Sequence, residues 1–262
     1  MKQKKILSIA VLLAFAISLK AQDFSLYEKK QFVQSQDTLR YRILYPVNYD
    51  EAKKYPLVLF LHGSGERGND NEAQLTWGGA LFLDSSNRIN FPSIVIFPQC
   101  PNNQSWARFS FSGKKDSLGG FGFPTDQPPS TPQLLVMQLL KQLLEENKID
   151  EKRIYVGGLS LGGFGTYDLL WRMPHFFAAA FPICGAGNPD KPAEYAKDFP
   201  VWIFHGGSDP VVPVGNAHLM LQSLQAAGAN VKYTEYPGVG HDSWKNAFAE
   251  PDLLPWLFAQ KK

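Results

Sequence analysis

The sequence lacks several features that would place it in particular protein classes. Its 262 residues include only two cysteines, with no CxxC pair and no clustered His, Cys and carboxylate spacing, so a structural zinc site has no support. We expect neither a metal ion nor a cofactor. Beyond the N-terminus, no segment stays apolar for about 20 residues, which argues against a membrane span in the mature chain.

The N-terminus has the layout of an export signal. Three lysines (Lys2, Lys4 and Lys5) precede an apolar run over residues 6–19, which ends near residues 20–22. We expect residues 1–21 to be a signal peptide cleaved after Ala21, which would make the mature protein periplasmic or secreted. The alternative is an uncleaved anchor.

The charge balance also excludes a class of partners. Four of the 26 basic residues lie in the expected signal, so 22 basic and 24 acidic residues remain, a net charge of −2. There is no lysine and arginine excess to indicate a nucleic-acid partner. Residues 22–262 show no internal repeat, and their length suits a single α/β domain.

Apolar, β-branched runs alternate with helical patterns along this region. Such alternation is typical of a mostly parallel sheet covered by helices on both faces. The expected strands are two antiparallel strands within 24–45, followed by 55–61, 93–97, 153–156, 178–183, 201–204 and 231–236. The expected helices are 72–83, 132–147, 160–172, 215–227 and 251–260.

Residues 101–131 interrupt this rhythm with glycine, proline, serine and five aromatic residues. A loop of this length inside a compact domain is usually functional or disordered. Two interpretations stay open: a covering loop whose aromatic side chains complete the core, or a lid that forms a substrate wall over an active site. The aromatic residues are Trp106, Phe109, Phe111, Phe121 and Phe123.

The strongest chemical signal is the pentapeptide Gly158-Leu159-Ser160-Leu161-Gly162, a G-x-S-x-G pattern between an expected strand and an expected helix. Such a turn strains the backbone of the serine and needs small residues on either side. It presents the serine hydroxyl at a helix N-terminus, where developing negative charge is favoured. Ser160 is therefore the candidate nucleophile, against the alternative of an ordinary N-cap serine.

With this turn, two further segments resemble the α/β-hydrolase superfamily, in particular its exported esterase and predicted-peptidase branch, related to dienelactone hydrolases and feruloyl or acetyl-xylan esterases. The first is Leu61-His62-Gly63-Ser64-Gly65-Glu66-Arg67-Gly68-Asn69-Asp70-Asn71, and the second is Phe97-Pro98-Gln99-Cys100-Pro101 followed by Trp106. The resemblance covers nearly all of residues 22–262. It implies an α/β-hydrolase fold with a mostly parallel sheet of about eight strands.

Acyl transfer needs two fixed donors for the oxyanion, and backbone N–H groups serve this purpose. The N–H of Leu161, directly after the nucleophile, is the first candidate. For the second we prefer the N–H of Ser64, with Gly63 as the alternative, in the loop that resembles the oxyanion loop of the branch. The simpler interpretation of His62-Gly63 is a turn at the end of a strand.

A serine hydroxyl also needs a base. Of five histidines, His241 follows the last expected strand on a glycine-rich loop, where the superfamily places its base. The orienting acid should come between serine and histidine, and Asp209 in His205-Gly206-Gly207-Ser208-Asp209-Pro210 fits the superfamily's acid motif. Asp190 and Asp242 are weaker competitors. Of the others, His62 and His205 are interpreted as structural hydrogen-bonding residues, whereas His175 follows an expected helix and His218 lies within one.

Large aromatic residues could complete the site. We expect Trp106, Trp77 and Trp244 to contact substrate, although aromatic residues near such sites are as often plain core. The superfamily's strand order would separate the strands before Cys100 and Cys184 by two others, so we expect two free, partly buried thiols.

The expected function is hydrolysis of carboxylic esters through an acyl-enzyme, with a small-molecule or carbohydrate-linked substrate such as a feruloyl ester. The same residues cleave amides in serine peptidases of the prolyl-oligopeptidase type, although the long N-terminal propeller of that group is missing here. A catalytically dead binding protein on a hydrolase scaffold is the remote third possibility. An aromatic loop in an exported enzyme does not by itself select the substrate.

Overall fold

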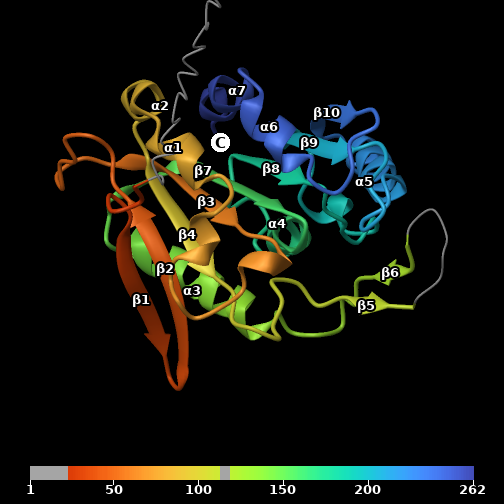
Figure 1. The fold of residues 1–262 in the computed structure, drawn as a ribbon, viewed down its shortest axis with the longest axis horizontal. Coiled ribbons are helices and arrows are strands. Elements are labelled where there is room, and N and C mark those ends of the chain that lie inside the picture. The colour runs from red at the N-terminus through yellow and green to blue at the C-terminus, as the bar shows by residue number, and fades with distance from the viewer. Residues whose placement is uncertain (1–22, 113–118) are drawn as a thin grey trace, which may run out of the picture.

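The fold is built on one sheet of eight strands, in the order β1-β2-β4-β3-β7-β8-β9-β10 (Figure 1). This computed structural model describes residues 23–112 and 119–262, and the expected signal peptide 1–21 lies outside these ranges. β2 pairs antiparallel with β1 and β4, and all other neighbours in the sheet are parallel. The expected mostly parallel sheet with an antiparallel pair at its start is confirmed. The strands are β1 (Glu28–Gln34), β2 (Asp37–Leu44), β3 (Tyr55–Leu61), β4 (Ile94–Gln99), β7 (Ile149–Leu159), β8 (Ala179–Ile183), β9 (Pro200–Gly206) and β10 (Asn230–Tyr236).

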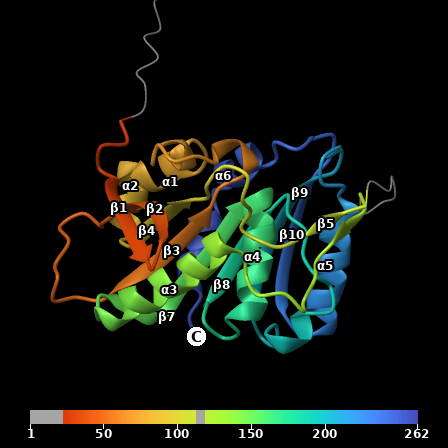
Figure 2. The same cartoon turned by 90° about the horizontal axis from the view of Figure 1, so that it is seen from below.

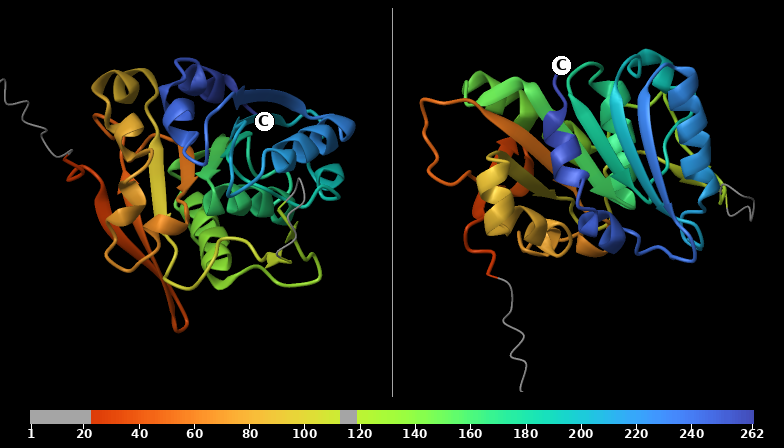
Figure 3. Two further views of the ribbon diagram at one scale, coloured as in Figure 1. Left: turned by 45° about the vertical axis from the view of Figure 1, so that its right-hand side comes forward. Right: turned by 90° about the horizontal axis from the view of Figure 1, so that it is seen from above.

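Helices cover both faces of the sheet. One face carries α3 (Thr131–Glu145), α4 (Leu161–Arg172) and α5 (Gly215–Ala226), which lie nearest the viewer in Figure 2. The other face carries α1 (Gly79–Leu83), α6 (Trp244–Ala249) and α7 (Leu253–Ala259), with α2 (Ser85–Asn90) beside them (Figure 3). Three short 3-10 turns complete the order: η1 (Ser64–Glu66), η2 (Ala73–Leu75) and η3 (Pro192–Glu194).

Strand β3 shows why the sheet has two cores. Leu57, Leu59 and Leu61 point into the apolar cluster that includes α3, α4 and α5, whereas Val58 and Phe60 point into the cluster beneath α1, α6 and α7. Successive side chains of a strand alternate between faces, so a strand buried on both sides has no polar face. This buried central region fixes the strand ends from which the candidate site residues project.

The structure differs from the expected helices in a few places. The helix expected over residues 72–83 is broken, because Gly78 has a positive φ of 83° and separates η2 from α1. A Cβ at Gly78 would come within 3.0 Å of the Phe248 ring. Helices α2 and α6, and the small hairpin of β5 (Ser110–Phe111) and β6 (Phe121–Gly122), were not expected. In the described ranges, no helix combines the length and apolar character needed to cross a bilayer.

Candidate active site

Ser160 lies at the sharp turn between β7 and α4. Its φ of 52° and ψ of −116° are unusual for a residue with a side chain. A Cβ on Gly158 would stand 2.3 Å from the Gly162 carbonyl oxygen, and one on Gly162 would stand 1.9 Å from the Leu61 carbonyl oxygen. The absence of side chains at Gly158 and Gly162 therefore lets this turn pack directly against the backbone at the end of β3. The Ser160 side chain remains partly exposed to solvent.

The loops after β9 and β10 bring two further side chains to Ser160. Its Oγ lies 2.8 Å from Nε2 of His241, and Nδ1 of His241 lies 2.7 Å from Oδ2 of Asp209. A carboxylate only accepts hydrogen bonds, so the imidazole proton belongs on Nδ1. Nε2 is then left with a lone pair that faces the serine hydroxyl. This geometry allows a proton to pass from Ser160 to His241.

Asp209 is held in its ionised form. Burial acts to raise its pKa, but hydrogen bonds from His205, His241 and the Val212 N–H outweigh this and lower the pKa below the usual range. The competing carboxylates lie elsewhere: Asp242 pairs with Lys245 at 2.8 Å, and Asp190 is exposed on the loop after β8.

The other histidines have different surroundings. Nδ1 of the buried His62 lies 2.6 Å from the Gly63 carbonyl oxygen, and its Nε2 accepts from the Cys100 N–H at 2.9 Å. Burial lowers the pKa of His62 to about 4. His218 on α5 pairs with Glu235 at 2.7 Å.

The loop after β3 stands next to the nucleophile turn. A Cβ on Gly63 would meet the Leu159 side chain at 2.7 Å, so this loop and the end of β7 are in close contact. Burial raises the pKa of Glu66, opposed by hydrogen bonds from its own N–H, the Gly63 N–H and the Trp77 indole. In this loop Gly63 is buried, whereas Ser64 is exposed. Leu161 begins α4, so its N–H belongs to the open first turn of that helix.

The three tryptophans separate into two groups. The rings of Trp77 and Trp244 lie 5.7 Å apart, and Trp244 also stands edge-on to His241 at 5.7 Å. Both are partly exposed, so they form an aromatic wall beside the imidazole. Trp106 corrects our expectation: it is fully buried, and its indole donates to the His62 carbonyl oxygen at 3.0 Å. It supports the loop after β3 from within the core.

The aromatic segment within 101–131 packs beside the first turn of α4. Phe109, Phe121 and Phe123 surround the ring of Phe164, with ring centroids 5.3 to 5.4 Å from it. The hairpin of β5 and β6 lies near α5 in Figures 1 and 2. Phe111 is 64% exposed. Phe109 is also exposed, at 37%, so these aromatic side chains pack around Phe164 while two of them remain partly open to solvent. Residues 113–118 of the expected lid lie outside the described ranges.

Both cysteines are free and buried. The strands that precede them, β4 and β8, are separated by β3 and β7, as expected. Burial raises the pKa of the Cys100 thiol to about 12 and that of Cys184 further. The ligand atoms of Cys184, Asp209 and His241 all lie within 4.8 Å of one another, so this thiol borders the candidate site from the inside.

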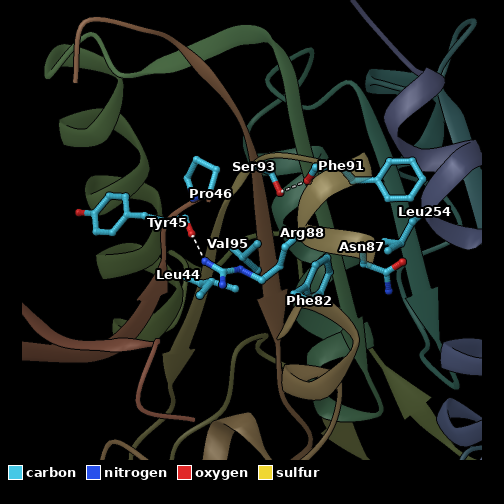
Figure 4. Close-up of a pocket in the computed structure, with 10 residues that line it drawn as sticks. All are labelled: Leu44, Tyr45, Pro46, Phe82, Asn87, Arg88, Phe91, Ser93, Val95 and Leu254. Carbon is cyan, nitrogen blue, oxygen red and sulfur yellow. Dashed lines mark hydrogen bonds between the residues drawn. The ribbon is translucent and has the colours of Figure 1, made fainter. Parts of the chain in front are cut away.

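The cavity drawn in Figure 4 lies away from these residues. Its lining comes from β2, β4, α1, α2 and α7, and Arg88 crosses it to donate to the Tyr45 carbonyl oxygen at 3.1 Å. It has room for about one water molecule, with a volume of about 10 Å³. A gap of this size does not suit a substrate. The contacts of Ser160, His241 and Asp209 with one another place the candidate site at Ser160.

Comparison with known proteins points in the same direction. Residues 45–250 match the phospholipase/carboxylesterase family. Acyl-protein thioesterase 1 of Gibberella zeae is 38% identical over 200 residues, which are 71% of this chain and 83% of that protein. A bifunctional acetylxylan esterase/xylanase of Neocallimastix patriciarum is 26% identical over 161 residues, 62% of this chain but only 20% of that protein.

A solved structure agrees over most of the chain. The crystal structure of a thermostable esterase superimposes on this chain with a TM-score of 0.80 and 36% sequence identity. The match covers 91% of this chain and 64% of the esterase chain. This chain thus spans less than two thirds of that esterase and a fifth of the acetylxylan esterase/xylanase. Sheet order, helix layers and the family match agree with one another, and the chain belongs to the phospholipase/carboxylesterase family of α/β-hydrolase enzymes.

Proposed function

We propose that this protein hydrolyses carboxylic esters, with Ser160 as nucleophile, His241 as general base and Asp209 as the carboxylate that orients it. The observation that carries the proposal is the continuous pair of short contacts, 2.8 Å from Ser160 Oγ to His241 Nε2 and 2.7 Å from His241 Nδ1 to Asp209 Oδ2. Serine, base and orienting group in hydrogen-bond reach are the arrangement that activates a hydroxyl.

The reaction would proceed in two halves. Ser160 Oγ attacks the ester carbonyl carbon while its proton moves to His241 Nε2, and the tetrahedral intermediate then expels the alcohol, which takes that proton. An acyl-enzyme remains. His241 next removes a proton from water, which attacks the acyl carbon and releases the carboxylic acid and free Ser160.

The oxyanion would be bound by the N–H groups of Leu161 and Ser64. The first belongs to the open turn at the start of α4, where the helix dipole favours negative charge. Ser64 is preferred over Gly63 because Ser64 is exposed, whereas Gly63 is buried. Losing one such donor typically costs about 10²- to 10³-fold in rate.

The substrate class we favour is an acyl or feruloyl ester, small or carbohydrate-linked. The partly exposed Trp77 and Trp244 beside His241 would offer flat apolar surfaces to a phenyl or sugar ring. One relative is named for an acetylxylan esterase activity, which supports this class. Cleavage of a signal peptide after Ala21 would bring the protein to such substrates outside the cytoplasm.

The test compares Ser160→Ala with Ser208→Ala, which removes an exposed hydroxyl on the neighbouring loop. We expect turnover of p-nitrophenyl acetate to disappear in the first variant and to persist in the second. A fluorophosphonate should add one mass increment to the wild type and none to Ser160→Ala. Undiminished turnover in Ser160→Ala would remove the assignment, and a wild type that neither turns over nor labels would indicate a dead scaffold.

A matched substrate panel decides the bond that is cleaved. Feruloyl, acetyl-sugar and alkyl esters should be cleaved, and an aminoacyl ester should be cleaved faster than the aminoacyl amide with the same acyl group. Faster cleavage of the amides would instead identify a peptidase.

A further inference from the structure

A second histidine lies near Asp209 and approaches the same carboxylate oxygen as His241. His205 lies near the end of β9, and its side chain is fully buried. Its Nε2 lies 2.8 Å from the Val212 carbonyl oxygen and 3.5 Å from Asp209 Oδ2. A carbonyl oxygen carries no proton, so the hydrogen bond to Val212 requires the proton on His205 Nε2. That single N–H faces both acceptors.

The other ring nitrogen of His205, Nδ1, indicates what holds the imidazole ring in this orientation. Nδ1 of His205 is buried and has no hydrogen-bond partner within the described residues. A buried polar atom without a partner is costly, so the ring orientation is maintained by what Nε2 gains. The gain is the link to Val212 and Asp209.

Three hydrogen bonds hold the Asp209 carboxylate. Oδ1 accepts from the N–H groups of Val211 and Val212, each at 2.9 Å. Oδ2 accepts from His241 and faces His205. Val212 therefore binds the carboxylate through its N–H and His205 through its C=O. His205 closes a ring of contacts that includes the turn Asp209–Val212.

We propose that His205 is a positioning residue for Asp209: its Nε2–H anchors the Val212 carbonyl and Oδ2, which fixes the carboxylate in the plane that His241 needs. This inference rests on the proposed function, since it gives His205 a role in the same site. His205 is fully buried and contacts Asp209 rather than the nucleophile, so it acts through Asp209 and does not bind substrate.

The consequence is a selective effect on the chemical step. Without the donor, the Val212 carbonyl loses its partner, and the turn whose Val211 and Val212 N–H groups hold Oδ1 becomes less firmly fixed. The carboxylate can then shift relative to His241. His241 would then spend less time with Nε2 aligned on Ser160. Ground-state substrate contacts stay unchanged, so kcat should fall while KM stays nearly constant.

The experiment compares two substitutions of similar length. His205→Gln can place an amide N–H near the position of Nε2, whereas His205→Met has no donor. We expect kcat on p-nitrophenyl acetate to fall on the order of 10-fold in His205→Met, the scale of a hydrogen bond to a charged group. His205→Gln should recover most of that loss, and KM should change less than about 2-fold in either variant. Rates are expressed per site labelled by a fluorophosphonate, which corrects for misfolded protein.

A second readout does not depend on turnover. The proton shared by His241 Nδ1 and Asp209 should give a low-field proton NMR signal that is sharp in the wild type and His205→Gln, and broadened or shifted in His205→Met. Equal kcat in the wild type and His205→Met, equal losses in both variants, or an unchanged signal in folded His205→Met would overturn the inference. A wild type without Ser160-dependent turnover would instead refute the proposed function.

Discussion

The Nδ1–H of His62 donates to the carbonyl oxygen of Gly63 at 2.6 Å, and that carbonyl shares one peptide group with the Ser64 N–H. The proton must be on Nδ1, because Nε2 accepts from the Cys100 N–H. The described residues contain no cis peptide, so C=O and N–H of this group point in opposite directions. A buried imidazole thus holds the oxygen inside and directs the Ser64 N–H outward.

Two substitutions of His62 separate its two hydrogen bonds. His62→Asn can still place an amide N–H near Nδ1 and donate to Gly63, whereas His62→Gln can accept from Cys100 near the position of Nε2 but loses the Gly63 bond. We expect His62→Gln to lower kcat by about 10²-fold, as for a lost oxyanion donor, and His62→Asn to lower it by less than about 10-fold. Steady-state kinetics on one ester measure both. Equal losses would mean that the Gly63–Ser64 peptide is held by other contacts.

The same histidine predicts a pH dependence of stability. Its pKa falls from 6.5 to about 4 on folding, mainly because of burial. Between these values the unfolded chain binds the proton and the folded chain does not, so stability is complete above pH 6.5 and declines as the pH falls toward 4. Carboxyl groups whose pKa is lowered on folding, such as Asp209, change the stability only at pH values below this range.

The measurement is the urea midpoint of unfolding at several pH values between 7 and 4, for wild type and His62→Asn. Burial raises the pKa of Glu66 and Asp168, and these groups act in the opposite sense, so the difference between the two proteins is the informative quantity. We expect the wild type to lose more stability than the variant on acidification. Parallel pH profiles would contradict this account of His62.

Replacing the glycine after the nucleophile should destabilise the protein far more than replacing a glycine in the neighbouring loop. A Cβ at Gly162 would stand 1.9 Å from the Leu61 carbonyl oxygen, whereas one at Gly65 would meet nothing within 4 Å. Gly162→Ala should lower the free energy of unfolding by about 3 kcal/mol or more, because the backbone of β3 must shift. Gly65→Ala should change it by less than about 1 kcal/mol. Urea unfolding of both variants checks the contrast, and similar midpoints would show that the turn relaxes easily.

Strand periodicity and turn chemistry made most of the fold predictable. Tyr55–Leu61 has no polar face, which identified a strand buried on both sides, and the glycines around Ser160 identified the strand-to-helix turn. The helix over 72–83 failed because apolar spacing does not report the positive φ of Gly78. Helix α6 was missed because its six residues are too few to show a period.

Individual contacts in the site were harder to foresee. Chain order indicated Ser160, Asp209 and His241, but nothing in the sequence separated Trp106 from Trp77. Burial decides between them, and burial depends on how the segment after β4 packs. The contact of His205 with Asp209 was also missed, although a histidine four residues before the acid at a strand end was the available signal.

The thiols should be unreactive in the folded protein. Cys100 and Cys184 are both fully buried, and burial raises the pKa of each, so neither offers an accessible thiolate at neutral pH. Titration with a disulfide reagent should detect no thiol in native protein and two in urea. A native count of one or two would show that the interior near Asp209 opens readily, or that the packing differs from that described.

Substitution of Trp77 should affect substrate binding, whereas substitution of Trp106 should affect stability. Trp77→Leu removes half of the aromatic wall beside His241, and we expect KM for a feruloyl ester to rise about 5- to 10-fold, the scale of about 1 kcal/mol of aromatic contact, with little change for an acetyl ester. Trp106→Phe keeps the ring but leaves the His62 carbonyl without its indole donor, which should cost about 1–3 kcal/mol of stability and leave KM for both esters unchanged. KM and urea midpoints for both variants and both esters test the distinction. A rise in KM for Trp106→Phe without one for Trp77→Leu would contradict this assignment. The fully buried Trp106 would then have to become accessible to the substrate.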